Sequence, residues 1–167
     1  WQTDFARIVR LQEQGDWDGA GALLGTGAEA LAASGAGVLA ICTNTMHLVS
    51  ESVASAGQPA QLVHIVEVVA QHAKRAGITR LGLLGTAYTM ESVDLYPPTL
   101  ESFGIETAIP SPEHRQAIQA HTFDELIQGE VTDVCRQTFA DAIRALIADG
   151  ADGIVLAPIR TGVGLRL

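Results

Sequence analysis

The segment GAGVLAICT at residues 35–43 decides the fold, because its pattern returns without a gap as GADGIVLAP at residues 150–158. Each copy has a glycine-alanine turn and then an apolar run of four residues. Such a run is too short for a helix and is flanked by residues that break helices, so it predicts a buried parallel strand. The alignment also makes Thr43 and Pro158 equivalent positions.

Strands and helices alternate along the rest of the chain. Apolar spacing and turn residues predict strands at residues 38–41, 81–84, 105–109 and 154–157. They predict helices at residues 5–14, 65–74, 112–128 and 132–148. Two further helices are predicted, one from Ala22 through Leu31 and one that carries Leu100 and Phe103. This alternation indicates parallel sheets with right-handed crossovers. With the repeat, it predicts an α/β fold of two pseudo-symmetric lobes, each a parallel sheet flanked by helices, with the active-site cleft between them. A chance likeness between two ordinary strand-helix units is the alternative.

The lobes have expected bounds. We expect the first lobe at residues 1–76 and the second at residues 77–157, with residues 158–167 starting a return to the first lobe. Ligands of parallel sheets bind beyond the carboxyl ends of the strands. The turns that follow the strands are therefore the places to look for a site.

Composition excludes several classes of function. The formal net charge of −9 opposes the binding of phosphate backbones, so no nucleic-acid partner is expected. No apolar run approaches the roughly 18 residues that a membrane helix needs, so no membrane is expected. The two cysteines and five histidines show neither a disulfide framework nor metal-ligand spacing. We expect no metal and a reducing, cytoplasmic setting.

Two turns combine hydroxyl and amide side chains after a strand. The first is CTNTMH at residues 42–47 and the second is GTAYTM at residues 85–90. Backbone N–H groups at the start of a helix and small neutral donors suit a carboxylate ligand. In both turns an ordinary helix cap is an equally good interpretation.

Three further side chains have two interpretations each. His47 is either a general base or a partly buried polar residue. Cys135 is a nucleophile or, more in keeping with its helical position, a small packing residue. Glu125 lies either on a solvated helix face or in the cleft.

The order of motifs resembles one known family. Residues 43–47 are similar to a CNTxH motif, residues 83–90 to an LLGTxxTM segment, residues 123–129 to an xxEELxxG helix, and residues 12–17 to an early QxxGxW turn. These motifs are those of the aspartate/glutamate racemases, and the likeness extends over nearly the whole chain.

The resemblance implies a racemase that works without pyridoxal phosphate or any other cofactor. One group removes the α-proton of a small amino acid, such as aspartate or glutamate, and a second group returns a proton to the opposite face. The resemblance implies a homodimer. It implies Thr43 and Cys42 as catalytic groups. The substrate contacts that it implies are Thr43, Asn44, Thr45, Thr86, Thr89 and Glu125, together with Gln12, Glu13 and Gln14 from the first loop.

The chain departs from the family at both catalytic positions. Thr43 replaces the first cysteine, and the second motif, GCTE, falls on residues 157–160, where Pro158 marks the lost second catalytic position. Cys42 stands one place early, and neighbouring residues at a strand end tend to point to opposite sides. Family members also carry an earlier strand and continue past Leu167, so truncation at both ends is expected.

Three hypotheses follow. The first is an amino-acid racemase, impaired because both usual cysteines are missing. The second is a catalytically vestigial protein of the same fold that binds amino acids or carboxylates. The third is a related enzyme that handles α-protons, such as a decarboxylase or isomerase, and needs one thiol.

Overall fold

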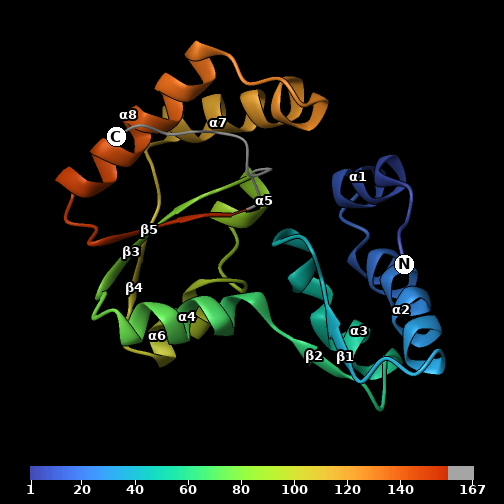
Figure 1. The fold of residues 1–167 in the computed structure, drawn as a ribbon. Helices are drawn as coiled ribbons and strands as arrows, with labels where there is room; N and C mark the ends of the chain where they lie inside the picture. Colours follow the sequence, from blue (N-terminus) through green and yellow to red (C-terminus); the bar gives the residue numbers. More distant parts are fainter. Residues whose placement is uncertain (158–167) are drawn as a thin grey trace. The chain divides into compact units, whose positions relative to one another are not determined.

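The computed structural model describes residues 1–157, which fall into two compact units (Figure 1). The first unit spans Trp1–Ile65 and the second begins at Val66. Each unit has a parallel sheet flanked by helices, as the sequence predicts. The lobe boundary at residue 76 stays a prediction, and Pro158 lies outside the described residues.

The first unit holds a two-stranded parallel sheet. Its elements are α1 (Phe5–Glu13), α2 (Trp17–Ala33), β1 (Val38–Ala40), the 3-10 helix η1 (Thr45–Val49), α3 (Ser50–Ala56) and β2 (Gln61–Val63). In the register of β1 and β2, Leu39 lies opposite Leu62. Leu39 also packs in a core cluster with residues of α2, η1 and α3. Strand β2 was not among the predicted elements, because it is short and weakly patterned.

The prediction that β1 is a buried strand is only partly right. Leu39 is 5% exposed, whereas its neighbour Val38 is 62% exposed. Successive side chains of a strand point to opposite faces. Leu39 therefore lies on the covered face, and Val38 and Ala40 lie on the other.

The second unit holds a three-stranded parallel sheet in the order β4-β3-β5. Its elements are α4 (Ile65–Arg75), β3 (Arg80–Leu84), α5 (Ala87–Met90), α6 (Pro97–Ser102), β4 (Glu106–Ala108), α7 (Pro112–Asp124), the 3-10 helix η2 (Leu126–Gln128), α8 (Asp133–Ala148) and β5 (Gly153–Leu156). Figure 1 shows α7 and α8 on one side of this sheet and α4 and α6 on the other. Because both faces are covered, the central strand β3 is buried from Leu81 to Leu84.

Asp152 fixes the start of β5 beside β3. Its carboxylate accepts hydrogen bonds from the backbone N–H of Thr79 (3.0 Å), the Thr79 hydroxyl (2.9 Å) and the backbone N–H of Arg80 (2.9 Å). These donors favour the ionised form and hold the pKa of Asp152 below its usual value. Asp152 belongs to the second copy of the repeat, and its role is to attach the start of β5 to the start of β3.

The two copies of the repeat share one helix-to-strand turn. Gly35 and Gly150 follow α2 and α8 with φ of 92° and 95°, a conformation that favours glycine. The next N–H bonds back to the helix in the same way, Ala36 to Leu31 O (3.1 Å) and Ala151 to Leu146 O (2.9 Å). The repeat is therefore real in local structure.

The predicted helix 112–128 is wrong in its last turn. α7 ends at Asp124, Glu125 leaves the helix with φ −123° and ψ −63°, and η2 follows. The chain then closes at Gly129, whose φ is 84°. This break turns the Glu125 side chain back onto its own helix and toward α8.

Candidate active site

The turn after β1 carries the residues expected to bind a carboxylate. Asn44 and Thr45 are 6% and 4% exposed, Thr43 is half-buried, and Cys42 is exposed. Within the described residues, the Asn44 side chain makes no capping hydrogen bond to η1. The helix-cap interpretation is therefore wrong for this side chain, and the carboxylate interpretation stays a prediction.

His47 holds this turn in place. Its Nδ1 lies 2.8 Å from the carbonyl oxygen of Thr43, and its Nε2 accepts the backbone N–H of Ile65 at 3.2 Å. A ring that accepts at Nε2 and donates at Nδ1 is neutral. Burial lowers the pKa of His47, and the nearby ring of His64 lowers it further. With both nitrogens engaged, His47 is a structural link and the general-base interpretation has no support.

The turn after β3 is built from buried hydroxyls. Thr86 is 8% exposed and Thr89 is fully buried, and their hydroxyl oxygens lie 3.3 Å apart. The Thr86 side chain does not cap α5 within the described residues. The backbone N–H of Ala87 instead donates to the Gln119 side chain on α7 at 2.8 Å. Gln119 was missed from the sequence, because only the packing of α5 against α7 brings it here.

Glu125 is partly buried and its carboxylate is held by two partners, so whether it reaches a cleft stays a prediction. Oε1 accepts from His121 Nδ1 at 2.6 Å and Oε2 accepts from the Thr132 hydroxyl at 2.6 Å. Thr132, and then His121, hold the pKa of Glu125 below its usual value, so the carboxylate is ionised near neutral pH.

Cys135 lies beside this carboxylate and is fully buried. Burial raises the pKa of the Cys135 thiol, and the negative charge of Glu125 raises it further. A protonated, buried thiol is a poor nucleophile. The burial of Cys135 therefore gives no support to its interpretation as a nucleophile.

The remaining expected residues are placed as follows. Gln12 and Glu13 belong to the last turn of α1 and Gln14 is its C-cap, so they do not lie in a loop as expected. Thr43 to Thr45 and Gln12 to Gln14 belong to the first unit, and Thr86, Thr89 and Glu125 belong to the second. Of these residues, the structure brings the hydroxyls of Thr86 and Thr89 together, and a common site across the units stays a prediction.

Comparison with known proteins agrees with this fold. The family model described as Asp/Glu/Hydantoin racemase matches residues 2–158. The chain belongs to this racemase family. Its two parallel sheets flanked by helices match the fold of this family.

Three solved structures are similar. A Yersinia pestis protein assigned as an Asp/Glu racemase has 38% identity and a TM-score of 0.81, covering 92% of this chain and 66% of its own. An aspartate racemase homologue from Pyrococcus horikoshii OT3 has 27% identity and a TM-score of 0.76, covering 99% of this chain and 74% of its own. Picrophilus torridus aspartate racemase has 21% identity and a TM-score of 0.56, covering 72% of this chain and 48% of its own. At this identity, the likeness shows the fold alone.

The chain spans just under two thirds of the Yersinia protein's length, 66%. Among the described residues, no helix combines the length and hydropathy that a bilayer crossing requires.

Proposed function

We propose that the chain is an amino-acid isomerase that interconverts the L- and D-forms of a small amino acid by moving its α-proton. The observation that carries the proposal is the family match over residues 2–158, with the CNTxH-like turn placed directly after a parallel strand. Aspartate and glutamate are the proposed substrates, because racemases for these acids are among the similar structures.

The proposed roles follow from the chemistry of each side chain. Asn44 and Thr45 supply neutral donors for the substrate carboxylate beside the end of β1. Thr43 approaches one face of the α-carbon, and Cys42 is the nearest thiol in the sequence. Thr86, Thr89 and Glu125 contribute from the second unit, and Gln12 to Gln14 from the end of α1.

Thr43 limits the rate in this proposal. A cysteine has an ordinary pKa of about 8.5, whereas a hydroxyl is a far poorer acid or base near neutral pH. The reaction needs no resident cofactor, since two positioned groups move the proton. The protein is proposed to act as a homodimer.

Incubation with L-aspartate or L-glutamate in heavy water tests the proposal. Two-base racemisation yields the D-enantiomer with deuterium at the α-carbon. One-base exchange yields deuterium alone, which would mean that a single group moves the α-proton.

A second candidate function is the binding of amino acids without turnover. The departure at Thr43 favours it, because that position holds no thiol. Binding without deuterium incorporation would support this candidate and reject the isomerase. Neither binding nor exchange would reject both.

A further inference from the structure

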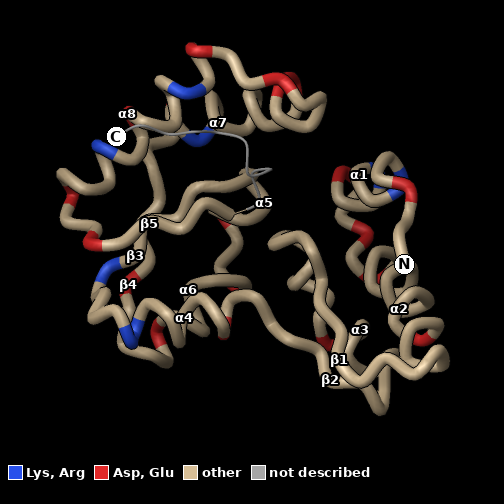
Figure 2. The backbone as a smooth tube through the Cα atoms, in the orientation of Figure 1, with Lys and Arg blue, Asp and Glu red and all other residues tan. Residues whose placement is uncertain are grey.

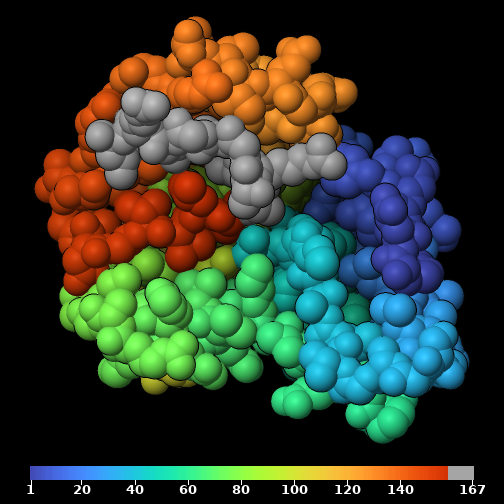
Figure 3. All heavy atoms as spheres, in the orientation of Figure 1, coloured from blue at the N-terminus to red at the C-terminus, as the bar shows by residue number. Residues whose placement is uncertain are grey.

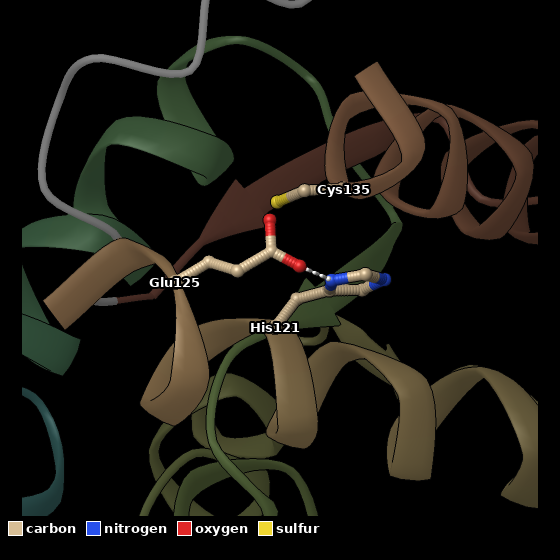
Figure 4. A group of neighbouring side chains, drawn as sticks. All are labelled: His121, Glu125 and Cys135. Atoms are coloured by element: carbon tan, nitrogen blue, oxygen red, sulfur yellow. Dashed lines mark hydrogen bonds and ion pairs between the residues drawn. The ribbon is translucent and has the colours of Figure 1, made fainter. Parts of the chain in front are cut away.

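The geometry points to a zinc site formed by His121, Glu125 and Cys135, which tie the end of α7 to the start of α8. Figure 4 shows the imidazole of His121 and the thiol of Cys135 directed toward the Glu125 carboxylate. A nitrogen, an oxygen and a sulfur of these side chains all lie within 4.8 Å of one another. This inference is independent of the proposed isomerase activity.

The three ligand types suit zinc. Zinc is bound by cysteine sulfur at about 2.3 Å, histidine nitrogen at about 2.0–2.1 Å and carboxylate oxygen at about 2.0–2.2 Å. A tetrahedral ion at these distances separates its ligand atoms by roughly 3.3–3.8 Å. The His121–Glu125 distance of 2.6 Å must therefore widen, and the sulfur must approach. Both shifts are on the order of 1 Å, and the fourth position is left to a water molecule.

The outer partners of the ligands are already in place. Thr132 donates to Oε2 of Glu125, which leaves Oε1 to face the ion. His121 Nε2 lies 3.2 Å from the Thr138 hydroxyl, which itself donates to Val134 O at 3.0 Å. Nε2 therefore donates to Thr138, and Nδ1 is left as the ligand atom. Histidine and carboxylate ligands of metals are ordinarily fixed by such second contacts.

Zinc would bind through the electron pairs of His121 Nδ1 and of the Cys135 thiolate sulfur. Because metal ligands bind in their deprotonated forms, zinc binding should release protons.

The sequence alone does not indicate this site. His121 and Cys135 are far apart for a short metal motif, and helices α7 and α8 bring them together (Figures 1 and 3). Glu125 is also a proposed substrate contact, so the zinc measurements are made without amino acid. Their failure then says nothing about catalysis.

Cobalt substitution in the Cys42→Ser protein is the first test. The chain has two cysteines, so Cys135 is the sole thiol in this variant. We expect a thiolate-to-cobalt charge-transfer absorption that disappears when zinc is added. A folded Cys42→Ser protein without this absorption would overturn the proposal, and the result does not depend on mutating Cys135.

Zinc titration of matched histidine variants is the second test. His121→Ala removes a ligand, whereas His72→Ala removes an exposed histidine of α4. The His121 variant should lose affinity by at least the 10- to 100-fold that changes in second-shell groups cost. The His72 variant should bind one zinc per chain, as the unmodified protein does. Equal zinc uptake by the two variants would refute the site.

Discussion

Thr43 carries a hydroxyl where the CNTxH motif of the family begins with a cysteine, and we propose that Pro158 marks the second cysteine position. Position 158 lies outside the described residues, so its role rests on the sequence repeat. Pro158→Cys should raise α-proton exchange in heavy water, because one positioned general acid or base contributes about 10²- to 10⁴-fold. Adding Thr43→Cys should bring true racemisation beyond either single change, measured as D-enantiomer formed.

Pro158→Ser is the control for this prediction. It shares the loss of the proline ring, which fixes φ, but adds no thiol. Equal exchange rates for the serine and cysteine variants would mean that position 158 is not the lost catalytic position. Substantial racemisation by the unmodified chain would assign the chemistry to Cys42 or another residue.

Asn44 is buried in the turn after β1, where we propose that it binds the substrate carboxylate. Asn44→Ala removes a donor to a charged group, so amino-acid binding should weaken by about 1.5–3 kcal/mol in isothermal titration. Ser55→Ala, an exposed change on α3, should leave the affinity as it is. Unchanged affinity in a folded Asn44→Ala protein would contradict the assignment.

His47 gives the stability of the chain a pH dependence of known sign. Its pKa is below the ordinary value of about 6.5 when folded, so between the two values the unfolded chain binds more protons. The stability that neutral His47 provides is present above pH 6.5 and is lost as the pH falls toward the folded value. In the His47→Asn variant, the side-chain amide keeps a donor for the Thr43 carbonyl but does not titrate. The free energy of unfolding in urea should therefore depend less on pH between about pH 7.5 and 5.5.

The same variant should also be less stable at neutral pH. It leaves the Ile65 N–H without its acceptor, which costs about 1–3 kcal/mol. His72→Asn, an exposed change, should keep the pH dependence of the unmodified chain. If the His47 and His72 variants respond to pH in the same way, the buried neutral ring is not the cause.

The ends of strands β3 and β5 approach each other closely at Gly85. A Cβ atom there would collide with the backbone carbonyl oxygen of Ala157, which cannot rotate away. Gly85→Ala should therefore destabilise the second unit by about 1–3 kcal/mol in urea unfolding, the usual cost of overpacking.

Gly37→Ala is the matched change for this prediction. A Cβ atom at Gly37 meets nothing within 4 Å, and its φ is not positive. It should be neutral or stabilise by about 0.4–1 kcal/mol through the unfolded chain. A Gly85 variant as stable as the Gly37 variant would show that the strand ends can separate freely.

The helix-to-strand turn of the repeat also occurs elsewhere in the chain, which weakens the repeat as evidence for two symmetric lobes. Gly77 and Gly104 end α4 and α6 with positive φ and the same backward hydrogen bonds that Gly35 and Gly150 have. The turn is thus common to several units of this chain. The shared turn is real, but it does not by itself separate lobe symmetry from ordinary repetition of helix and strand.

The charge of the whole chain should slow the approach of an acidic substrate. The net charge is −9, and no Lys or Arg occurs in residues 11–73 or 81–114, which include both candidate turns (Figure 2). Salt shortens the Debye length from about 30 Å at 0.01 M to about 8 Å at 0.15 M. The association rate of L-aspartate should therefore rise over this range, measured by stopped flow.

L-Alanine is the control, because its zwitterion carries no net charge and should respond little to salt. An aspartate affinity that falls as salt is added would mean that a cation contacts the substrate. That outcome would contradict a site made of neutral donors.

The sequence by itself determined the family, the alternation of strands and helices and the positions of the turns. These features depend on apolar spacing and on the positions of glycines, which specify the structure of short segments. It also placed Asn44, Thr45, Thr86 and Thr89 at the strand ends. Only the tertiary structure decided what each polar side chain contacts. His47 binds the N–H of Ile65, Gln119 binds the N–H of Ala87, and Glu125 leaves its helix to bind Thr132. These partners come from other elements, and packing of those elements, which local pattern does not encode, brings them within hydrogen-bonding distance.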